Sequence, residues 1–348
     1  MLKKADFSDC VDSAEISNNL LSTLRDRLLA VGVKHAMVVG SAARDEMSFV
    51  IQRDKLVSLS DIEMIIVDHR GLDKDLCRSE IELAAKDFDL GPFFGIDVDF
   101  LSPLRLRTLR NRLFTYEAFH QGLELIGSPK AFFSDYRISG LDKIDLALSL
   151  LWRVFALEGS LSRITDNYKS ESDQFFYQQY FVARNILDLL TVFLYFKGHS
   201  ETTYATRLAL AKELASKDQL LIDSFELYQN AMRWKTTPAL AFYDSKINTE
   251  DFRMNMYKII AYLKKINFKY NKNIPSRFLF FLWECYCYRF SICALYKHDC
   301  IFRLCNNPNE LIYNFLEEYS SSGSISRDNY LRLTRFFPYL KGVNIQLS

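Results

Sequence analysis

The chain has 348 residues, of which 49% are hydrophobic and 25% are charged, and its formal net charge is +1. This ordinary globular composition excludes a disordered or fibrous chain, and the length is sufficient for two domains. A charge so close to zero falls well short of the basic surface that a dedicated nucleic-acid-binding protein presents.

The first third of the chain alternates helical and strand-like segments. Helical periodicity is read from apolar residues three and four apart, and strands from short apolar runs. In chain order the sequence predicts a helix at 13–30, a strand at 35–39, an inserted hairpin around 49–59, a strand at 64–67, a helix at 77–88, and strands at 95–101 and 123–127.

A glycine–serine pair closes the first of these apolar runs. Gly40-Ser41 follows the run 35–39 and precedes a short helical stretch that contains Arg44. Glycine lets the backbone approach a phosphate closely, and an arginine one turn later can add a fork of donors. The chain contains neither a G-x-x-x-x-G-K-[ST] nor a G-x-G-x-x-G pattern, so a P-loop or Rossmann site is not predicted.

Four carboxylates lie on the next two predicted strands. Asp61 and Glu63 are two residues apart, and so are Asp97 and Asp99. Side chains two apart on a strand leave the same face, which crowds negative charge unless a cation lies among them. Mg²⁺ bridging carboxylates and substrate phosphates is the natural occupant, and two such ions would stabilise an in-line displacement at phosphorus.

The motifs resemble those of a known superfamily. Gly40-Ser41-x-x-Arg44 and Ser60-Asp61-Ile62-Glu63-Met64 look like the signature of the DNA polymerase β nucleotidyltransferase superfamily. The second string is especially similar to that of kanamycin nucleotidyltransferase-like small-molecule nucleotidyltransferases. The resemblance implies a mixed sheet with helices on one side, two Mg²⁺ ions and a nucleoside triphosphate donor, most often ATP.

The resemblance also assigns roles to individual residues. Gly40 and Ser41 would hold the β- and γ-phosphates with help from Arg44, while Asp61 and Glu63 would bind metal.

The third metal ligand would be Asp97 or Asp99. Asp99 fits better, because Phe100-Leu101-Ser102 continue the strand before Pro103. The same carboxylate, lying near the acceptor, would help to activate the attacking oxygen.

The match covers about the first third of the chain and departs from the family in three ways. Nineteen residues separate Ser41 from Asp61, more than the compact family spacing, which suggests the inserted hairpin. Asp45 stands where glycine is commoner, and aspartate can take a helical conformation there. The catalytic base of the kanamycin enzyme lies outside these motifs and has no assigned counterpart here.

Two further groups of residues have both a functional and a structural interpretation. A basic helix after Pro103 carries Arg105, Arg107, Arg110 and Arg112, which either approach an anion or form a solvated helix face, and the second is favoured. Tyr204 and Arg207 either line a cleft or serve as a helix-start cap and a packing residue, and again the second is favoured.

Beyond about residue 139 the chain is helical in pattern. Helical periodicity or length marks the segments 141–157, 175–196, 203–214, 219–232, 252–266, 277–296, 310–319 and 329–337. The sequence therefore predicts an α+β protein with a nucleotidyltransferase domain at 1–135 and an all-α bundle at 136–348 that walls the cleft.

Cysteine usage and hydropathy bear on the compartment. Seven cysteines form no C-x-x-C pair, so free thiols in a reducing cytoplasm are expected, and a metal site at His298, Cys300 and Cys305 is disfavoured. The apolar run 278–296 carries Glu284 and Arg289, which favours a buried helix over a membrane span. No signal peptide is visible.

These observations predict a Mg²⁺-dependent nucleotidyltransferase that acts on a hydroxyl of a small molecule. One alternative keeps the chemistry but modifies RNA, a protein or another nucleotide. A second alternative is a nucleotide-binding regulator that has lost catalysis. A homodimer is possible, because the superfamily includes dimers.

Overall fold

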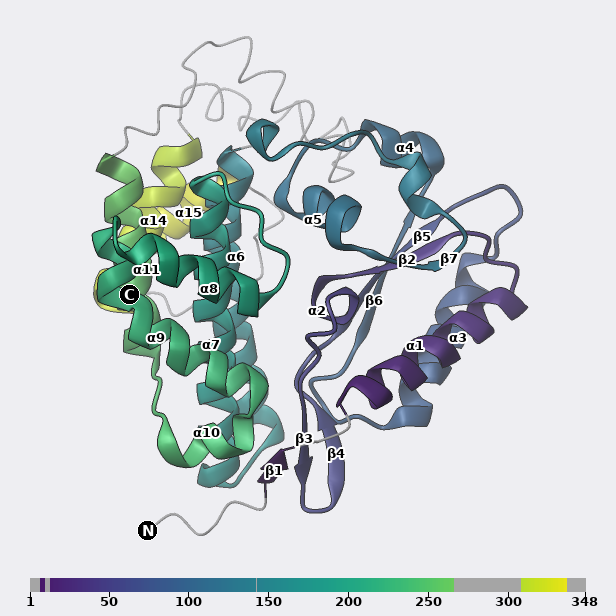
Figure 1. Cartoon of the computed structure of the whole chain (residues 1–348), viewed down its shortest axis with the longest axis horizontal. Helices are drawn as coiled ribbons and strands as arrows, with labels where there is room; N and C mark the ends of the chain where they lie inside the picture. The colour runs from purple at the N-terminus through teal and green to yellow at the C-terminus, as the bar shows by residue number, and fades with distance from the viewer. Residues whose placement is uncertain (1–6, 10–12, 142, 266–307, 337–348) are drawn as a thin grey trace.

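The computed structural model describes residues 7–9, 13–141, 143–265 and 308–336. It forms two lobes, one built of strands and helices and one built of helices alone (Figure 1). The α+β class, with a mixed sheet and a helical C-terminal region, is confirmed. The specific polymerase β-like fold and the division at 135/136 stay predictions.

The main sheet has four strands in the order β6-β5-β2-β7. Strand β2 runs antiparallel to both of its neighbours, whereas β5 and β6 are parallel and are connected through helix α3. The predicted strands are therefore present, with bounds β2 Ala36–Val39, β5 Ile62–Val67, β6 Ile96–Leu101 and β7 Leu123–Ile126.

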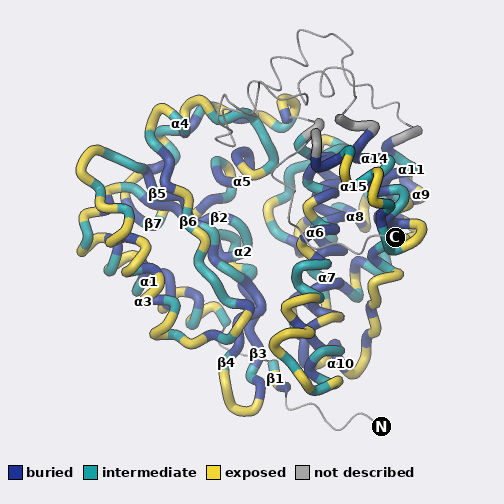
Figure 2. Tube along the Cα trace, turned by 180° about the vertical axis from the view of Figure 1, so that it is seen from behind, coloured by how far each residue is buried: buried dark blue, intermediate teal, exposed yellow. Residues whose placement is uncertain are grey.

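The two faces of this sheet are covered differently. Helices α1 (Ser13–Ala30) and α3 (Lys74–Phe88) cover one face, where Leu20, Leu24 and Leu28 of α1 pack in one core with alternate residues of β5. The outer sides of these helices are exposed, as Figure 2 shows. On the opposite face Ile65 and Val67 belong to a core that continues into the helical lobe. Polar side chains on that face therefore point toward the helical lobe.

The predicted hairpin is present and belongs to a second, small sheet. Strands β3 (Phe49–Gln52) and β4 (Lys55–Ser58) pair antiparallel, and β1 (Phe7–Asp9), which the sequence did not predict, adds to β3. The Tyr177 hydroxyl donates to Gln52 Oε1 at 2.8 Å, and the Phe7 ring stacks on Phe176 at 3.9 Å between centroids. The insertion thus ties the strand-bearing lobe to the helical lobe.

The helical lobe is organised around α7 (Glu171–Phe196), most of whose residues are buried. The other described helices of this lobe are α6 (Lys143–Asn167), α8 (Tyr204–Ala215), α9 (Gln219–Thr236), α10 (Pro238–Asp244), α11 (Thr249–Lys265), α14 (Pro308–Ser322) and α15 (Arg327–Phe336). Seven of these eight helices were predicted, and α10 was not. The predicted helix at 277–296 and the residues His298, Cys300 and Cys305 lie outside the described residues.

Two shorter helices connect strand β6 to strand β7. After Pro103 the chain forms α4 (Pro103–Thr108) and then α5 (Leu113–Gln121), so the predicted basic helix ends earlier than expected.

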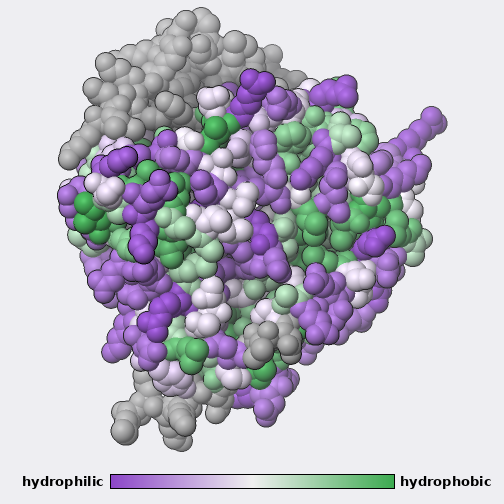
Figure 3. All heavy atoms as spheres, viewed as in Figure 1, coloured by the Kyte–Doolittle hydropathy of each residue, from purple (hydrophilic) through white to green (hydrophobic). Residues whose placement is uncertain are grey.

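The surface seen in Figure 3 is mainly hydrophilic, with the larger hydrophobic area on the strand-bearing lobe and smaller ones on the helical lobe. None of the helices in the described part of the chain combines the length and the apolar character needed to cross a lipid bilayer.

Candidate functional site

The glycine–serine turn lies directly against one of the predicted carboxylates. Strand β2 ends at Val39, which pairs with Glu63 of β5, and Gly40 then turns with φ +70° to open the short helix α2 (Gly40–Ala43). A Cβ at position 40 would lie 3.2 Å from Glu63 Oε2. Glycine is therefore favoured here by the left-handed backbone, and a Cβ would require the carboxylate to shift slightly.

The four predicted carboxylates lie on one face of the sheet. Asp61 immediately precedes β5, and Glu63 follows two residues later. In the parallel ladder Asp97 is the partner of Glu63 and Asp99 is the partner of Ile65. Since Ile65 faces the helical lobe, the carboxylates face it too.

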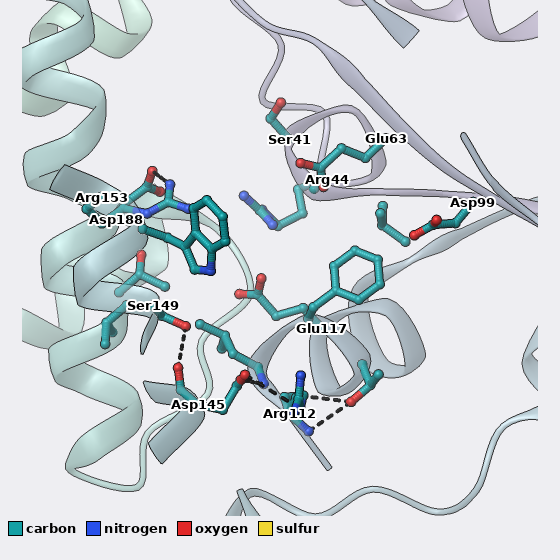
Figure 4. A pocket seen from close by; sticks show the side chains of 18 of the residues that line it. Ser41, Arg44, Glu63, Asp99, Arg112, Glu117, Asp145, Ser149, Arg153 and Asp188 are labelled. Atoms are coloured by element: carbon teal, nitrogen blue, oxygen red, sulfur yellow. Dashed lines mark hydrogen bonds and ion pairs between the residues drawn. The ribbon is translucent and has the colours of Figure 1, made fainter. Parts of the chain in front are cut away.

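A cavity of about 450 Å³ opens between this sheet face and the helical lobe. Figure 4 shows Glu63 and Asp99 on one side of it, with Arg153 and Asp188 on the other. Of the residues predicted from sequence, the cavity wall contains Gly40, Ser41, Arg44, Asp61, Glu63 and Asp99. Asp97 is not part of the wall, although it is adjacent to Glu63 in the ladder. Of the two residues left open from the sequence, Asp99 lies in the cavity wall and Asp97 is the ladder partner of Glu63. An ion that bridged a substrate phosphate would have to lie in the cavity, so wall position favours Asp99 for the expected third ligand.

The electrostatics of the carboxylates fit a cation. Burial and the negative charges of Asp61 and Asp97 raise the pKa of Glu63. Among the described residues the side chain of Glu63 has no hydrogen-bond or ion-pair partner. Carboxylate oxygens are the ligands that Mg²⁺ prefers, so the chemistry of these side chains suits this ion. As placed, however, no three acidic, histidine or cysteine side chains of the described chain lie close enough together to hold a metal.

Asp61 has a cationic partner from the helical lobe. Arg184 of α7 donates to Asp61 Oδ1 at 3.2 Å. Burial alone would raise the pKa of Asp61, but the positive charge of Arg184 holds it below its ordinary value. A metal ion would have to compete with Arg184 for this carboxylate.

Arg44 lies in the cavity wall but is tied to neighbouring groups. Its side chain pairs with Glu46 at 2.8 Å and lies 5.6 Å from the centre of the Tyr204 ring. Glu46 in turn accepts a hydrogen bond from the Tyr204 backbone N–H. Asp45, between them, has φ +57°, so the expectation that it takes the helical conformation is wrong: its backbone is in the left-handed region, which aspartate tolerates better than most residues.

Helices α6 and α7 contribute charged groups that were not predicted from the sequence. Arg153 of α6 pairs with Asp188 of α7 at 2.5 Å, and Tyr204 donates to the same carboxylate at 2.6 Å. One sequence signal was available: Arg184 and Asp188 are the only charged residues between positions 175 and 196. Charges in the middle of an apolar helix seldom lie there without a partner or a function.

The structure also corrects the interpretation of the basic segment after Pro103. A solvated helix face is the wrong description for Arg105, Arg110 and Arg112, because all three line the cavity. Arg107 alone of the four is exposed to solvent in the expected way.

Arg207 is both a packing residue and part of the cavity wall, whereas Tyr204 lines the cavity but does not cap the helix. Arg207 is 2% exposed and packs as predicted, donating to Glu117 at 2.8 Å and to Thr191 Oγ1 at 3.1 Å. The helix-start cap of α8 is Thr203 rather than Tyr204. Tyr204 and Arg207 also line the cavity.

A second cavity, of about 340 Å³, meets the first at the carboxylates. The two walls share Asp61, Glu63, Arg153 and Arg184. Asp61 and Glu63 therefore lie where two adjoining cavities meet.

Comparison of this chain with family models, with curated proteins and with solved structures found no match.

Proposed function

We propose that this protein is a Mg²⁺-dependent nucleotidyltransferase. It would transfer a nucleoside monophosphate from ATP or another nucleoside triphosphate to a hydroxyl group of a small molecule. The observation that supports the proposal is that Gly40, Ser41, Asp61, Glu63 and Asp99, from three separate segments, line one cavity. A phosphate seat beside several carboxylates is what two-metal transfer at phosphorus requires.

In this proposal each group has a distinct task. Gly40 lets the backbone approach the β- and γ-phosphates, and the Ser41 hydroxyl is available to donate to them. Arg44 adds positive charge beside the triphosphate. Asp61, Glu63 and Asp99 would hold magnesium, which, when bound, supplies positive charge to the reacting phosphate.

At phosphorus the proposed reaction breaks one bond and forms one. The acceptor oxygen bonds to the α-phosphorus, and the bond from that phosphorus to the α,β-bridging oxygen breaks. Pyrophosphate leaves with the electrons of the broken bond. Asp99 would accept the hydroxyl proton, since its side chain has no hydrogen-bond or ion-pair partner among the described residues.

The ion pair between Asp61 and Arg184 favours a different function. In a nucleotide-binding regulator without catalysis, Arg184 would hold Asp61 permanently and no metal would be needed there. Both side chains are partly exposed, so solvent and ions have access to the pair. Exchange of Arg184 for a metal is therefore physically reasonable, and catalysis remains the favoured proposal.

The test measures nucleotide turnover and its metal dependence. Wild-type protein is incubated with Mg²⁺, each nucleoside triphosphate and a panel of sugars, sugar acids, sugar alcohols and aminoglycosides, and released pyrophosphate is quantified. We expect pyrophosphate release that EDTA abolishes. Asp61→Asn should reduce it more than roughly 100-fold, because even outer partners of metal ligands contribute 10–100-fold.

The matched control is Asp75→Asn on α3, whose side chain is 94% exposed on the far side of the sheet. It should leave turnover unchanged. Binding of Mg²⁺–ATP without pyrophosphate release under every acceptor would favour the regulator instead. Equal turnover in Asp61→Asn and wild type would refute the assignment.

A further inference from the structure

The second cavity has a wall that differs from that of the first. It is lined by α6, α7 and Phe93, and it reaches Asp61 and Glu63 from the side that does not contain Gly40 and Ser41. Its volume of about 340 Å³ lies within the roughly 300–1,000 Å³ of small-molecule sites. A molecule bound there would meet the carboxylates opposite a triphosphate seated on the glycine turn.

One buried polar group in this wall lacks a partner. Asn185 of α7 is 3% exposed, and its Nδ2 donates to the Phe181 carbonyl at 2.8 Å. That bond fixes the orientation of the amide, and Asn185 Oδ1 is left without any hydrogen bond. A buried acceptor without a donor is costly, so a ligand hydroxyl that donates to this oxygen would relieve the cost.

The charged groups of this wall favour an anion. Arg153, Arg163 and Arg184 face two carboxylates, Asp61 and Glu63. Arg153 and Arg184 are held by ion pairs with Asp188 and Asp61, whereas Arg163 has no side-chain partner among the described residues. A guanidinium presents several donors in a plane that matches a carboxylate or phosphate.

The remaining wall offers an apolar surface and space. Phe93 and Phe181 lie 4.8 Å apart between ring centroids, and Phe155 completes the aromatic part. A Cβ on Gly159 of α6 would meet no atom within 4 Å, so the helix leaves open room at this point. An aromatic wall of this kind suits the C–H face of a small ring.

We propose that this second cavity binds the acceptor, and that the acceptor is a small polyhydroxylated acid carrying a phosphate or a carboxylate. The proposal rests on the nucleotidyltransferase function argued above. Asn185 Oδ1 accepts a hydrogen bond from one hydroxyl, and Arg163 binds the anionic group. A second hydroxyl, beside Asp61 and Glu63, is the nucleophile: its oxygen bonds to the α-phosphorus, and its proton passes to Asp99 of the first cavity. The bond from the α-phosphorus to the α,β-bridging oxygen breaks, and pyrophosphate leaves with its electrons. Cationic aminoglycosides are disfavoured, because bound metal would add to the charge of three arginines.

The experiment compares four probe acceptors at fixed Mg²⁺–ATP: glucose 6-phosphate, glucuronate, glucose and kanamycin. We measure pyrophosphate release above the rate without acceptor, and detect nucleotidylated product by mass spectrometry. Stimulation by glucose 6-phosphate or by glucuronate is expected, and the stronger of the two identifies the anionic group. Stimulation by glucose or kanamycin alone, or by none of the four, would overturn the proposal.

Two variants and a matched control complete the test. Arg163→Gln should raise the KM for the stimulating acid at least tenfold, and by more than the KM for ATP; Asn185→Leu should act in the same direction. Arg25→Gln, at an exposed arginine of α1 outside both cavities, should change neither constant. An unaltered KM for the acid in Arg163→Gln would refute the proposed site.

The two proposals fail separately. If the wild-type protein releases pyrophosphate from Mg²⁺–ATP but no acid stimulates it, the acceptor site is wrong and the nucleotidyltransferase function stands. If Mg²⁺–ATP is neither bound nor turned over, the function itself is wrong.

Discussion

Replacing Gly40 by alanine separates the backbone role of this residue from its role beside Glu63. Gly40 has φ +70°, and an L-residue in the left-handed region costs roughly 1–2 kcal/mol. The new Cβ would lie 3.2 Å from Glu63 Oε2, so the carboxylate must move by a few tenths of an ångström. A flexible carboxylate can do so at small cost, and we therefore expect the loss of stability to stay at about 1–2 kcal/mol.

Gly32→Ala is the matched control. Gly32 has φ +84°, and a Cβ there would meet no atom within 4 Å. Both variants should lose similar stability in urea unfolding, since both carry the same kind of backbone penalty. Pyrophosphate release should fall by roughly 100-fold in Gly40→Ala alone, because small misplacements at a reacting centre cost about that much.

Two results would refute this reasoning. Equal turnover in Gly40→Ala and Gly32→Ala would mean that neither the glycine turn nor the exact place of Glu63 matters for turnover. Unchanged stability in Gly40→Ala would mean that the left-handed turn after β2 is not the native conformation.

The remaining predictions concern the third carboxylate, a buried tyrosine and a buried arginine. Asp99→Asn should reduce pyrophosphate release more than roughly 100-fold and Asp97→Asn much less, with the reverse order assigning the third ligand to Asp97. Burial raises the pKa of Tyr136 from its ordinary value of 10 to about 12 in the folded protein. The unfolded chain therefore loses the phenolic proton first, so the free energy of unfolding is unaffected below pH 10 and falls as the pH rises toward 12. Urea unfolding at pH 9 and 11 should show about 1.4 kcal/mol more loss in wild type than in Tyr136→Phe, and equal losses would contradict the shift. Arg207→Met should lower the free energy of unfolding by roughly 3 kcal/mol, because it removes a buried guanidinium from Glu117, whose side chain is 20% exposed and keeps only the Tyr195 hydroxyl as a donor. Arg233→Met at an exposed ion pair should cost less than about 1 kcal/mol, and similar losses in the two variants would argue against a stabilising Arg207–Glu117 pair.

Much of the strand-bearing lobe follows from local sequence. The helix predicted at 13–30 has those bounds, because its apolar residues repeat at helical spacing and pack on one sheet face. The hairpin was predicted from the long spacing between Ser41 and Asp61, and β3 and β4 fill that interval. These features depend on residues close together in the chain, which is why the sequence alone was enough.

The rest of the site depends on contacts that local sequence does not encode. Arg184 and Asp61 are 123 residues apart, and no periodicity relates them. The side chains of Arg105, Arg110 and Arg112 were expected on a solvated helix because their pattern is that of an exposed face. These side chains line a cavity because the helical lobe lies opposite them in the folded protein.

The same distinction explains why the sequence indicates a reaction but not an acceptor. The proposed phosphate seat and metal ligands lie on adjacent strands, β2, β5 and β6, so a few short motifs contain all of them. The proposed acceptor cavity is built mainly from single side chains of α6 and α7, such as Arg163 and Asn185, that become neighbours only when the helices pack. Changes at such positions leave the helical pattern intact. The acceptor can therefore change in evolution without any trace in the motifs, and the unpartnered oxygen of Asn185 is a better guide to it than any string of residues.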